Sequence, residues 1–105
     1  DRINIKNDGK DLAFITIKII DEKGRLVPTA NNEIIFELEG PGEIVATDNG
    51  DPTDMTSFVS KQRKAFNGLC LAIVKFKKDN GNKKITLKAY SDGLQETTID
   101  IYPSN

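Results

Sequence analysis

Apolar residues alternate with polar ones along most of this chain, and no stretch of useful length repeats them at the spacing of an amphipathic helix. The segment 33–39 shows the pattern most clearly, because Ile34, Phe36 and Leu38 share one face while glutamates occupy most of the other. A period of two residues is typical of a strand with one buried and one solvated face, as in an antiparallel sheet. The chain is therefore predicted to be all-β.

Further strands are predicted on the same grounds, with turn residues between them. They cover residues 12–21, 43–47, 69–76, 84–91 and 95–102, with an N-terminal strand around Ile3 and Ile5 and a short edge strand within 58–66. Asn67-Gly68 is the strongest hairpin signal, since both residue types accept a positive φ. Seven to eight short strands with turns every 8–12 residues predict an immunoglobulin-like antiparallel β-sandwich of Greek-key type.

The alternation also assigns the core. The residues expected there are Ile15, Ile17, Ile34, Phe36, Leu38, Val74, Ile85, Leu87 and Ile99, with Thr97 on the same inner face and most of the phenylalanines buried. The segment 69–76 is apolar on both faces, which predicts a central strand covered on both sides. Cys70 lies in this segment and is expected to be a small core residue.

Length and charge restrict what the chain can be. Residues 1–105 fit a single domain, which leaves no room for a deep substrate cavity beside the core. The net charge of −1 gives no reason to expect a nucleic-acid partner, and no window is long and apolar enough for membrane insertion. The only methionine is Met55, so the segment is expected to be processed or excised from a larger chain.

Catalytic groups are scarce. The chain has no histidine, which removes histidine-dependent nucleophiles and nearly all zinc sites. Glu33, Glu37 and Glu39 share a strand face, but a solvated face offers no apolar pocket to raise one carboxyl pKa for glycoside hydrolysis. We therefore predict no catalytic residue, no cofactor and no metal.

Two groups of residues fit both a functional and a purely structural interpretation. Asp48, Asn49, Asp51 and Asp54 carry oxygens that calcium accepts, but their spacing is not that of an EF-hand, and a surface turn uses the same residue types. Tyr90 and Tyr102 point outward in adjacent predicted strands and could form a small platform for a sugar, although ordinary exposed strand positions explain them equally well. A plain turn and plain strand positions are favoured.

Two segments, 40–53 and 63–74, carry more specific motifs. These are Gly40-Pro41-Gly42, Asn49-Gly50-Asp51-Pro52 and Arg63-Lys64-Ala65-Phe66-Asn67-Gly68, preceded by the stretches 11–17 and 21–30. Together they resemble the immunoglobulin-like domain found towards the C-terminus of many β-galactosidase-type enzymes of glycoside hydrolase family 2. The resemblance covers nearly the whole chain.

The resemblance implies a non-catalytic accessory domain of an enzyme that cleaves terminal β-glycosidic bonds. In such enzymes a (β/α)₈ barrel carries the catalytic glutamates, and no such glutamate motif is present here. The implied partners are the other domains of the same polypeptide, with carbohydrate as a further candidate, and the implied location is periplasmic or extracellular. Residues 21–28 alone would also fit an invasin-like immunoglobulin module of a bacterial adhesin or stalk, but the loop motifs favour the glycosidase.

The motif residues suggest where such a domain would contact the rest of the enzyme. The candidate interdomain contacts are Asp48, Asn49, Gly50, Asp51, Pro52, Arg63, Lys64, Phe66 and Asn67. Arg63 and Lys64 would pair with carboxylates of the partner, and Phe66 would supply an apolar anchor. In the alternative account Phe66 belongs to the core and the loop only caps its own strands.

Overall fold

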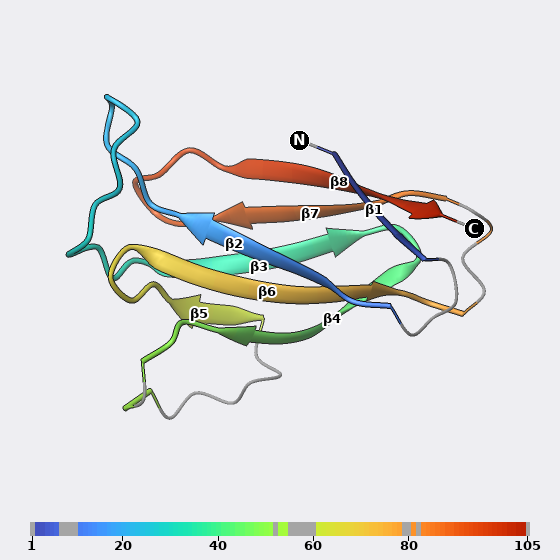
Figure 1. The fold of residues 1–105 in the computed structure, drawn as a ribbon. Helices are drawn as coiled ribbons and strands as arrows, with labels where there is room; N and C mark the ends of the chain where they lie inside the picture. The colour runs from blue at the N-terminus through green and yellow to red at the C-terminus, as the bar shows by residue number, and fades with distance from the viewer. Residues whose placement is uncertain are drawn as a thin grey trace.

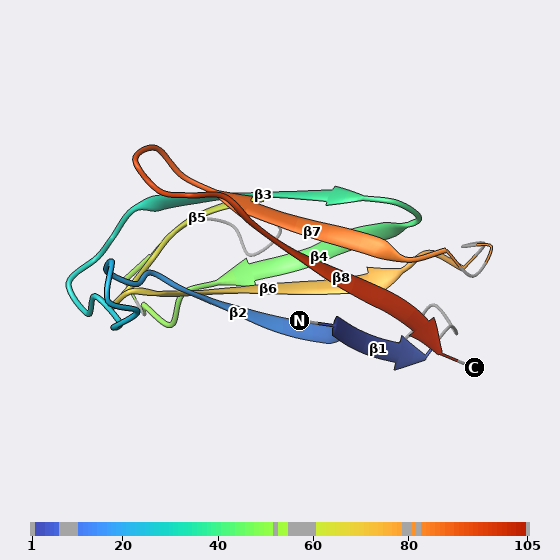
Figure 2. The ribbon, with the colours of Figure 1, turned by 90° about the horizontal axis from the view of Figure 1, so that it is seen from above.

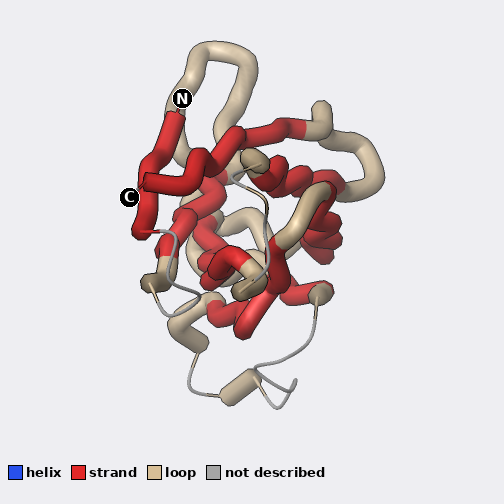
Figure 3. Tube along the Cα trace, turned by 90° about the vertical axis from the view of Figure 1, so that its right-hand side faces the viewer, coloured by secondary structure: helices blue, strands red, loops and turns tan. Residues whose placement is uncertain are grey.

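The computed structural model describes residues 2–6, 11–51, 53–54, 61–78, 81 and 83–104, with backbone only for 2–6 and 104. Its eight strands are β1 (Arg2–Lys6), β2 (Ala13–Lys18), β3 (Glu33–Glu39), β4 (Gly42–Asp48), β5 (Gln62–Lys64), β6 (Leu69–Phe76), β7 (Ile85–Tyr90) and β8 (Thr97–Ser104). Pro52, Met55 and Phe58 lie outside the described residues. The described part contains strands and loops (Figure 3) and no helix that could cross a membrane.

The strands form two layers (Figures 1 and 2). A five-stranded sheet has the order β1-β8-β7-β3-β5, and a three-stranded sheet has the order β2-β6-β4. The predicted β-sandwich is confirmed. Its strands are antiparallel except for one pair, because β1 runs parallel to β8, with Arg2 opposite Asp100 and Lys6 opposite Ser104. The N-terminal strand around Ile3 and Ile5 is thus confirmed, but as the parallel edge of the larger sheet.

The core lies between the two sheets and follows the predicted alternation. Of the predicted core residues, Ile15, Ile34, Phe36, Val74, Ile85 and Leu87 are buried, and Ile17, Leu38 and Ile99 are partly buried against them. Thr97 lies on the inner face as predicted, opposite the buried Ala89, but its side chain is exposed. Thr97 lines an open cavity of about 190 Å³ between β2 and the start of β8, where the sandwich is not closed.

Two expectations about the three-stranded sheet also need correction. Phe36 and Phe76 are buried as expected for phenylalanine, but the side chain of Phe14 is 62% exposed. Strand β6 was expected to be covered on both faces, yet only the face that carries Cys70, Ala72, Val74 and Phe76 is fully buried. Its other face, with Leu69, Leu71 and Ile73, is half-buried.

The hairpin predicted at Asn67-Gly68 is confirmed. Asn67 has a φ of 54° and Gly68 a φ of 77°, as a two-residue type I′ turn requires. The amide of Phe66 donates to the carbonyl of Leu69 at 2.9 Å, and the amide of Leu69 returns a bond of 3.0 Å. A Cβ on Gly68 would lie 2.3 Å from the carbonyl oxygen of Val27, so close packing also requires glycine there.

Candidate functional site

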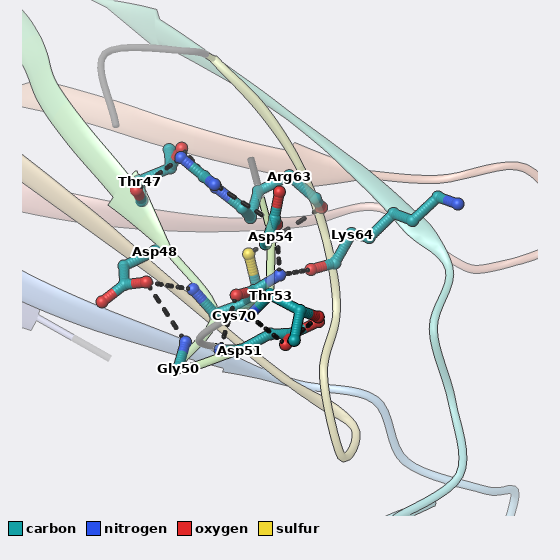
Figure 4. A network of polar contacts seen from close by, with 10 residues as sticks. Thr47, Asp48, Gly50, Asp51, Thr53, Asp54, Arg63, Lys64 and Cys70 are labelled. Atoms are coloured by element: carbon teal, nitrogen blue, oxygen red, sulfur yellow. Dashed lines mark hydrogen bonds and ion pairs between the residues drawn. The ribbon is translucent and has the colours of Figure 1, made fainter. Parts of the chain in front are cut away.

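The candidate contact residues come together at one end of the sandwich. Strand β4 ends at Asp48, and the loop that follows lies beside β5 and the hairpin into β6 (Figure 4). A hollow of about 450 Å³ opens between part of the loop and these strands. It is lined by Asn31, Glu33, Asn49, Asp51, Thr53, Asp54, Lys64, Ala65 and Phe66. The two motif-bearing segments are therefore neighbours in space.

The loop is held in shape by its own side chains. Asp48 Oδ1 accepts hydrogen bonds from the amides of Asn49 at 2.8 Å and Gly50 at 3.2 Å. Asp51 Oδ1 accepts from the amide of Thr53 at 2.9 Å and from its hydroxyl at 2.7 Å. Gly50 supplies a φ of 77° between these two aspartates. These contacts are those of a self-capped turn.

Asn49 fastens the loop to β5. Its side chain is buried, and its Nδ2 donates to Asp54 Oδ2 and to the carbonyl of Lys64, both at 2.7 Å. Its Oδ1 accepts from the amide of Asp51 at 2.9 Å. One amide side chain thus satisfies groups on both sides of the loop, as burial of a polar group demands.

Arg63 lies inside the domain, with only 1% of its surface exposed. Its Nε and Nη2 donate to the hydroxyl and the carbonyl of Thr47 at 3.2 and 2.9 Å, and its Nη1 lies 3.3 Å from Asp54 Oδ2. The inward direction follows from the register, because Arg63 pairs with the buried Ile34 of β3. Ion pairing with Asp54 offsets the cost of removing the guanidinium from water.

The predicted role of Arg63 is therefore wrong: a side chain in the interior is not available to a carboxylate on another domain. Lys64 and Asn67 are exposed, while Asp48, Asp51 and Phe66 are partly buried. For these residues contact with another domain remains a prediction. From the sequence, Asp54 was considered only as a possible calcium ligand. Its ion pair with Arg63 could not be predicted, because the sequence does not show that the two residues are close in space.

Neither metal nor thiol chemistry gains support from the geometry. Within the described residues, no three side chains among His, Cys, Asp and Glu gather to hold a metal ion. Cys70 is buried, its Sγ lies 3.9 Å from the carbonyl of Arg63, and burial raises the pKa of the thiol to about 12. Cys70 is thus a neutral core residue, as predicted.

The two tyrosines do not form a joint platform. Thr97 of β8 pairs with Ala89 and Ile101 pairs with Ile85, so Tyr90 and Tyr102 lie at opposite ends of the β7–β8 ladder, about 20 Å apart by strand rise. The hydroxyl of Tyr90 donates to Glu37 Oε1 at 2.7 Å, which raises the pKa of Tyr90. The less favoured alternative, a shared sugar-stacking platform, is therefore wrong.

Comparison with known proteins decides the family. Residues 1–100 match the family described as glycoside hydrolase family 2 C-terminal domain 5. The chain belongs to this family. The domain is 42% identical over 101 residues to the β-galactosidase BoGH2A of Bacteroides ovatus, a match that covers 96% of the domain and 12% of the β-galactosidase.

Solved structures agree with this assignment. The domain superposes on a glycosyl hydrolase family 2 member from Bacteroides cellulosilyticus with a TM-score of 0.89 and 33% identity, over 96% of the domain and 14% of that chain. A β-glycosidase from Bacteroides vulgatus gives a TM-score of 0.88 and 29% identity, over 94% and 13% of the two chains. The domain therefore spans about an eighth of these relatives, and the resemblance to invasin-like adhesins is not favoured.

Proposed function

We propose that the domain is a non-catalytic accessory part of a β-galactosidase-type enzyme that cleaves terminal β-glycosidic bonds in carbohydrates. The observation that carries the proposal is the match to a C-terminal domain that occupies only 12% of a β-galactosidase with 42% identity. The partners of the domain would be the other domains of its own polypeptide, including the catalytic barrel. Its contribution would be structural, through docking.

The carboxylates of the domain support a non-catalytic role. Glu37 lies on the exposed face of β3 and is engaged by the hydroxyl of Tyr90 and, at 3.8 Å, by Lys88. Of the carboxylates that line the hollow, Glu33, Asp51 and Asp54, Asp54 is paired with Arg63 and Asp51 accepts two hydrogen bonds from Thr53. A general acid for glycoside hydrolysis needs an apolar setting, whereas Glu37, Asp51 and Asp54 are bonded to polar or charged partners.

The test compares the isolated domain, the full-length parent enzyme and a parent enzyme from which residues 1–105 are deleted. With an aryl β-galactoside, we expect turnover by the full-length enzyme and none by the isolated domain. The deletion should lower thermal stability through lost docking. Turnover by the isolated domain that disappears on a single Glu or Asp substitution would overturn the proposal.

A further inference from the structure

The outer faces of the two sheets differ in how many apolar side chains they carry. On the five-stranded sheet, Lys88 lies 3.8 Å from Glu37 and 3.2 Å from Glu96, and Lys84 lies 3.3 Å from Asp100. Thr86 adds a 2.8 Å hydrogen bond to Asp100. Charged and polar side chains that pair with one another are typical of a sheet face in contact with water.

The outer face of the three-stranded sheet combines polar and apolar side chains. Lys75 lies 3.4 Å from Glu43, and Thr16, Lys18 and Asp48 lie on the same face, but a strip of apolar side chains runs along β6 and onto β2. Register places Phe14, Ile73 and Ala46 in one row across the three strands, with Leu71 and then Leu69 in the next rows along β6. We call the outer apolar face the set Leu12, Phe14, Leu69, Leu71 and Ile73. Leu12 and Phe14 are 37% and 62% exposed, and the three β6 residues are half-buried.

These side chains do not belong to the core of the sandwich. Their strand neighbours Ile15, Ala72 and Val74 point inward and are buried, so the alternation turns Phe14, Leu71 and Ile73 away from it. A solvated antiparallel face would carry polar residues at these positions. A contiguous apolar patch on a sheet is typical of a surface that another protein surface covers.

The size of the face indicates the kind of partner. Three strands at about 4.8 Å spacing and about eight residues at 3.3 Å rise give an area of roughly 380 Å², or roughly 760 Å² with the facing surface. That total lies within the range of about 600–1,500 Å² for interfaces between domains of one chain. It falls short of the roughly 1,200–2,000 Å² of a stable complex between separate molecules, which disfavours a second copy.

From these observations we infer that the outer apolar face packs against an apolar patch of another domain in the same polypeptide. This inference rests on the proposed function, since it takes the domain to be part of a longer enzyme. About seven-eighths of the matched relatives lie outside the matched region, so a partner within the chain is available at high effective concentration. The three-stranded sheet is thus the middle layer between its own core and the neighbouring domain.

The test measures how fast a maleimide modifies cysteines placed on the two outer faces of the full-length parent enzyme. Thr16→Cys reports on the outer apolar face, and Thr98→Cys is the matched control on the five-stranded sheet, because both threonines are exposed in the domain. Cys70 is buried and serves as an internal marker of folding. Peptide mapping separates these sites from other cysteines.

We expect the Thr16→Cys variant to react at least about ten times more slowly than the Thr98→Cys variant, and both to react equally in urea. Adding Phe14→Glu to the Thr16→Cys variant should raise the rate to that of the control, while Cys70 stays unmodified. Equal rates in the native enzyme would overturn the inference. So would protection that disappears on dilution with a change in oligomeric state, or protection that appears only with added sugar.

Failure of this inference is distinguishable from failure of the proposed function. If the full-length enzyme hydrolyses glycosides while both cysteines react equally, the proposed accessory role stands and the proposed docking face is wrong. Hydrolysis by the isolated domain would remove the accessory role whatever the labelling rates.

Discussion

Arg63 is the largest fully buried side chain among the described residues. Its charge is balanced by Asp54 and by the carbonyl of Thr47. Removing one partner from a buried ion pair leaves the other charge without compensation, which is more costly than replacing both. The loop after β4 and the short strand β5 therefore depend on one another through a single guanidinium.

We expect Arg63→Ala to lower the free energy of unfolding of the isolated domain by about 3–5 kcal/mol. Urea denaturation followed by circular dichroism measures the loss. The neighbouring Lys64→Ala is the control, because Lys64 is exposed and its removal should change stability by no more than about 0.5 kcal/mol. Equal losses for the two variants would contradict a structural role for the buried charge.

Because Cys70 is buried, we expect the free energy of unfolding to fall at alkaline pH. Burial raises the pKa of its thiol from an ordinary 9.0 to about 12, so the unfolded chain releases this proton at lower pH than the folded domain does. The contribution of the thiol to stability is complete below about pH 9 and is lost as pH rises towards 12. Over that window the free energy of unfolding should fall by up to about 1.4 kcal/mol per pH unit from this group.

The measurement is urea denaturation of the wild type and of a Cys70→Ala variant at several values between pH 8 and pH 11. The variant starts from lower stability, but its curve should lack the slope that Cys70 adds, while all other titrating groups remain the same. Parallel curves for the two proteins would show that the thiol ionises equally well in the folded state.

Strand β3 lies between β7 and the edge strand β5 in the five-stranded sheet and carries Phe36, which is 1% exposed. Phe36→Ala removes a large side chain from a closed core and should cost about 3–5 kcal/mol. Phe14→Ala is a matched control on β2, because the same atoms are removed from a side chain that is largely exposed in the isolated domain. Its cost there should stay within about 0.5 kcal/mol, again by urea denaturation. Comparable costs would contradict the assignment of inner and outer faces.

The hairpin between β5 and β6 should tolerate no side chain at Gly68. Gly68→Ala forces a side chain into positive φ and also against the Val27 carbonyl, so the backbone must move. Gly93→Ala imposes the same kind of φ, 79°, but meets no atom within 4 Å. We expect Gly93→Ala to cost about 1–2 kcal/mol and Gly68→Ala clearly more, as thermal unfolding would report. Equal losses of stability for the two variants would mean that the backbone at Val27 moves aside at no cost in free energy.

The positions of most strands could be predicted from the sequence, but the register in which they pair could not. Alternation located β3 and β7 because each has one apolar face, and an apolar run between turn signals located β6. Asn67-Gly68 located the hairpin because few other pairs accept two positive φ values. Strand β5 is only three residues long and shows no apolar pattern. Its register against β3 decides that Arg63 points inward, and register depends on contacts between segments remote in sequence.

For the molecule as a whole, the fold and the family could be predicted from the sequence, and the loop segments 48–54 and 63–68 proved to be neighbours. Their chemistry was less predictable. Arg63 and Asp54 form an ion pair although they lie in different segments. The sequence shows that each is charged, but not whether its partner lies within the domain or in another domain. Phe14 was equally ambiguous, because an apolar residue facing away from one core can belong to an interface.

One prediction about docking belongs to the whole enzyme. Lys64 is exposed at the margin of the hollow next to the loop, where contact with another domain remains a proposal. If that contact forms, Lys64→Glu should lower the melting temperature of the full-length enzyme by a few degrees and leave that of the isolated domain unchanged. Unchanged melting of both proteins would restrict this loop to its internal role.

The parallel pairing of β1 with β8 has a mechanical consequence. A pulling force applied through Arg2 and Ser104 draws β1 backwards and β8 forwards along their shared ladder, because the two strands run in the same direction. The five paired positions from Arg2 to Lys6 are then loaded in shear, so that their hydrogen bonds must fail together instead of one after another. An antiparallel edge strand pulled in the same way would peel open from one end. The domain is therefore expected to withstand tension applied between its two ends without opening its core.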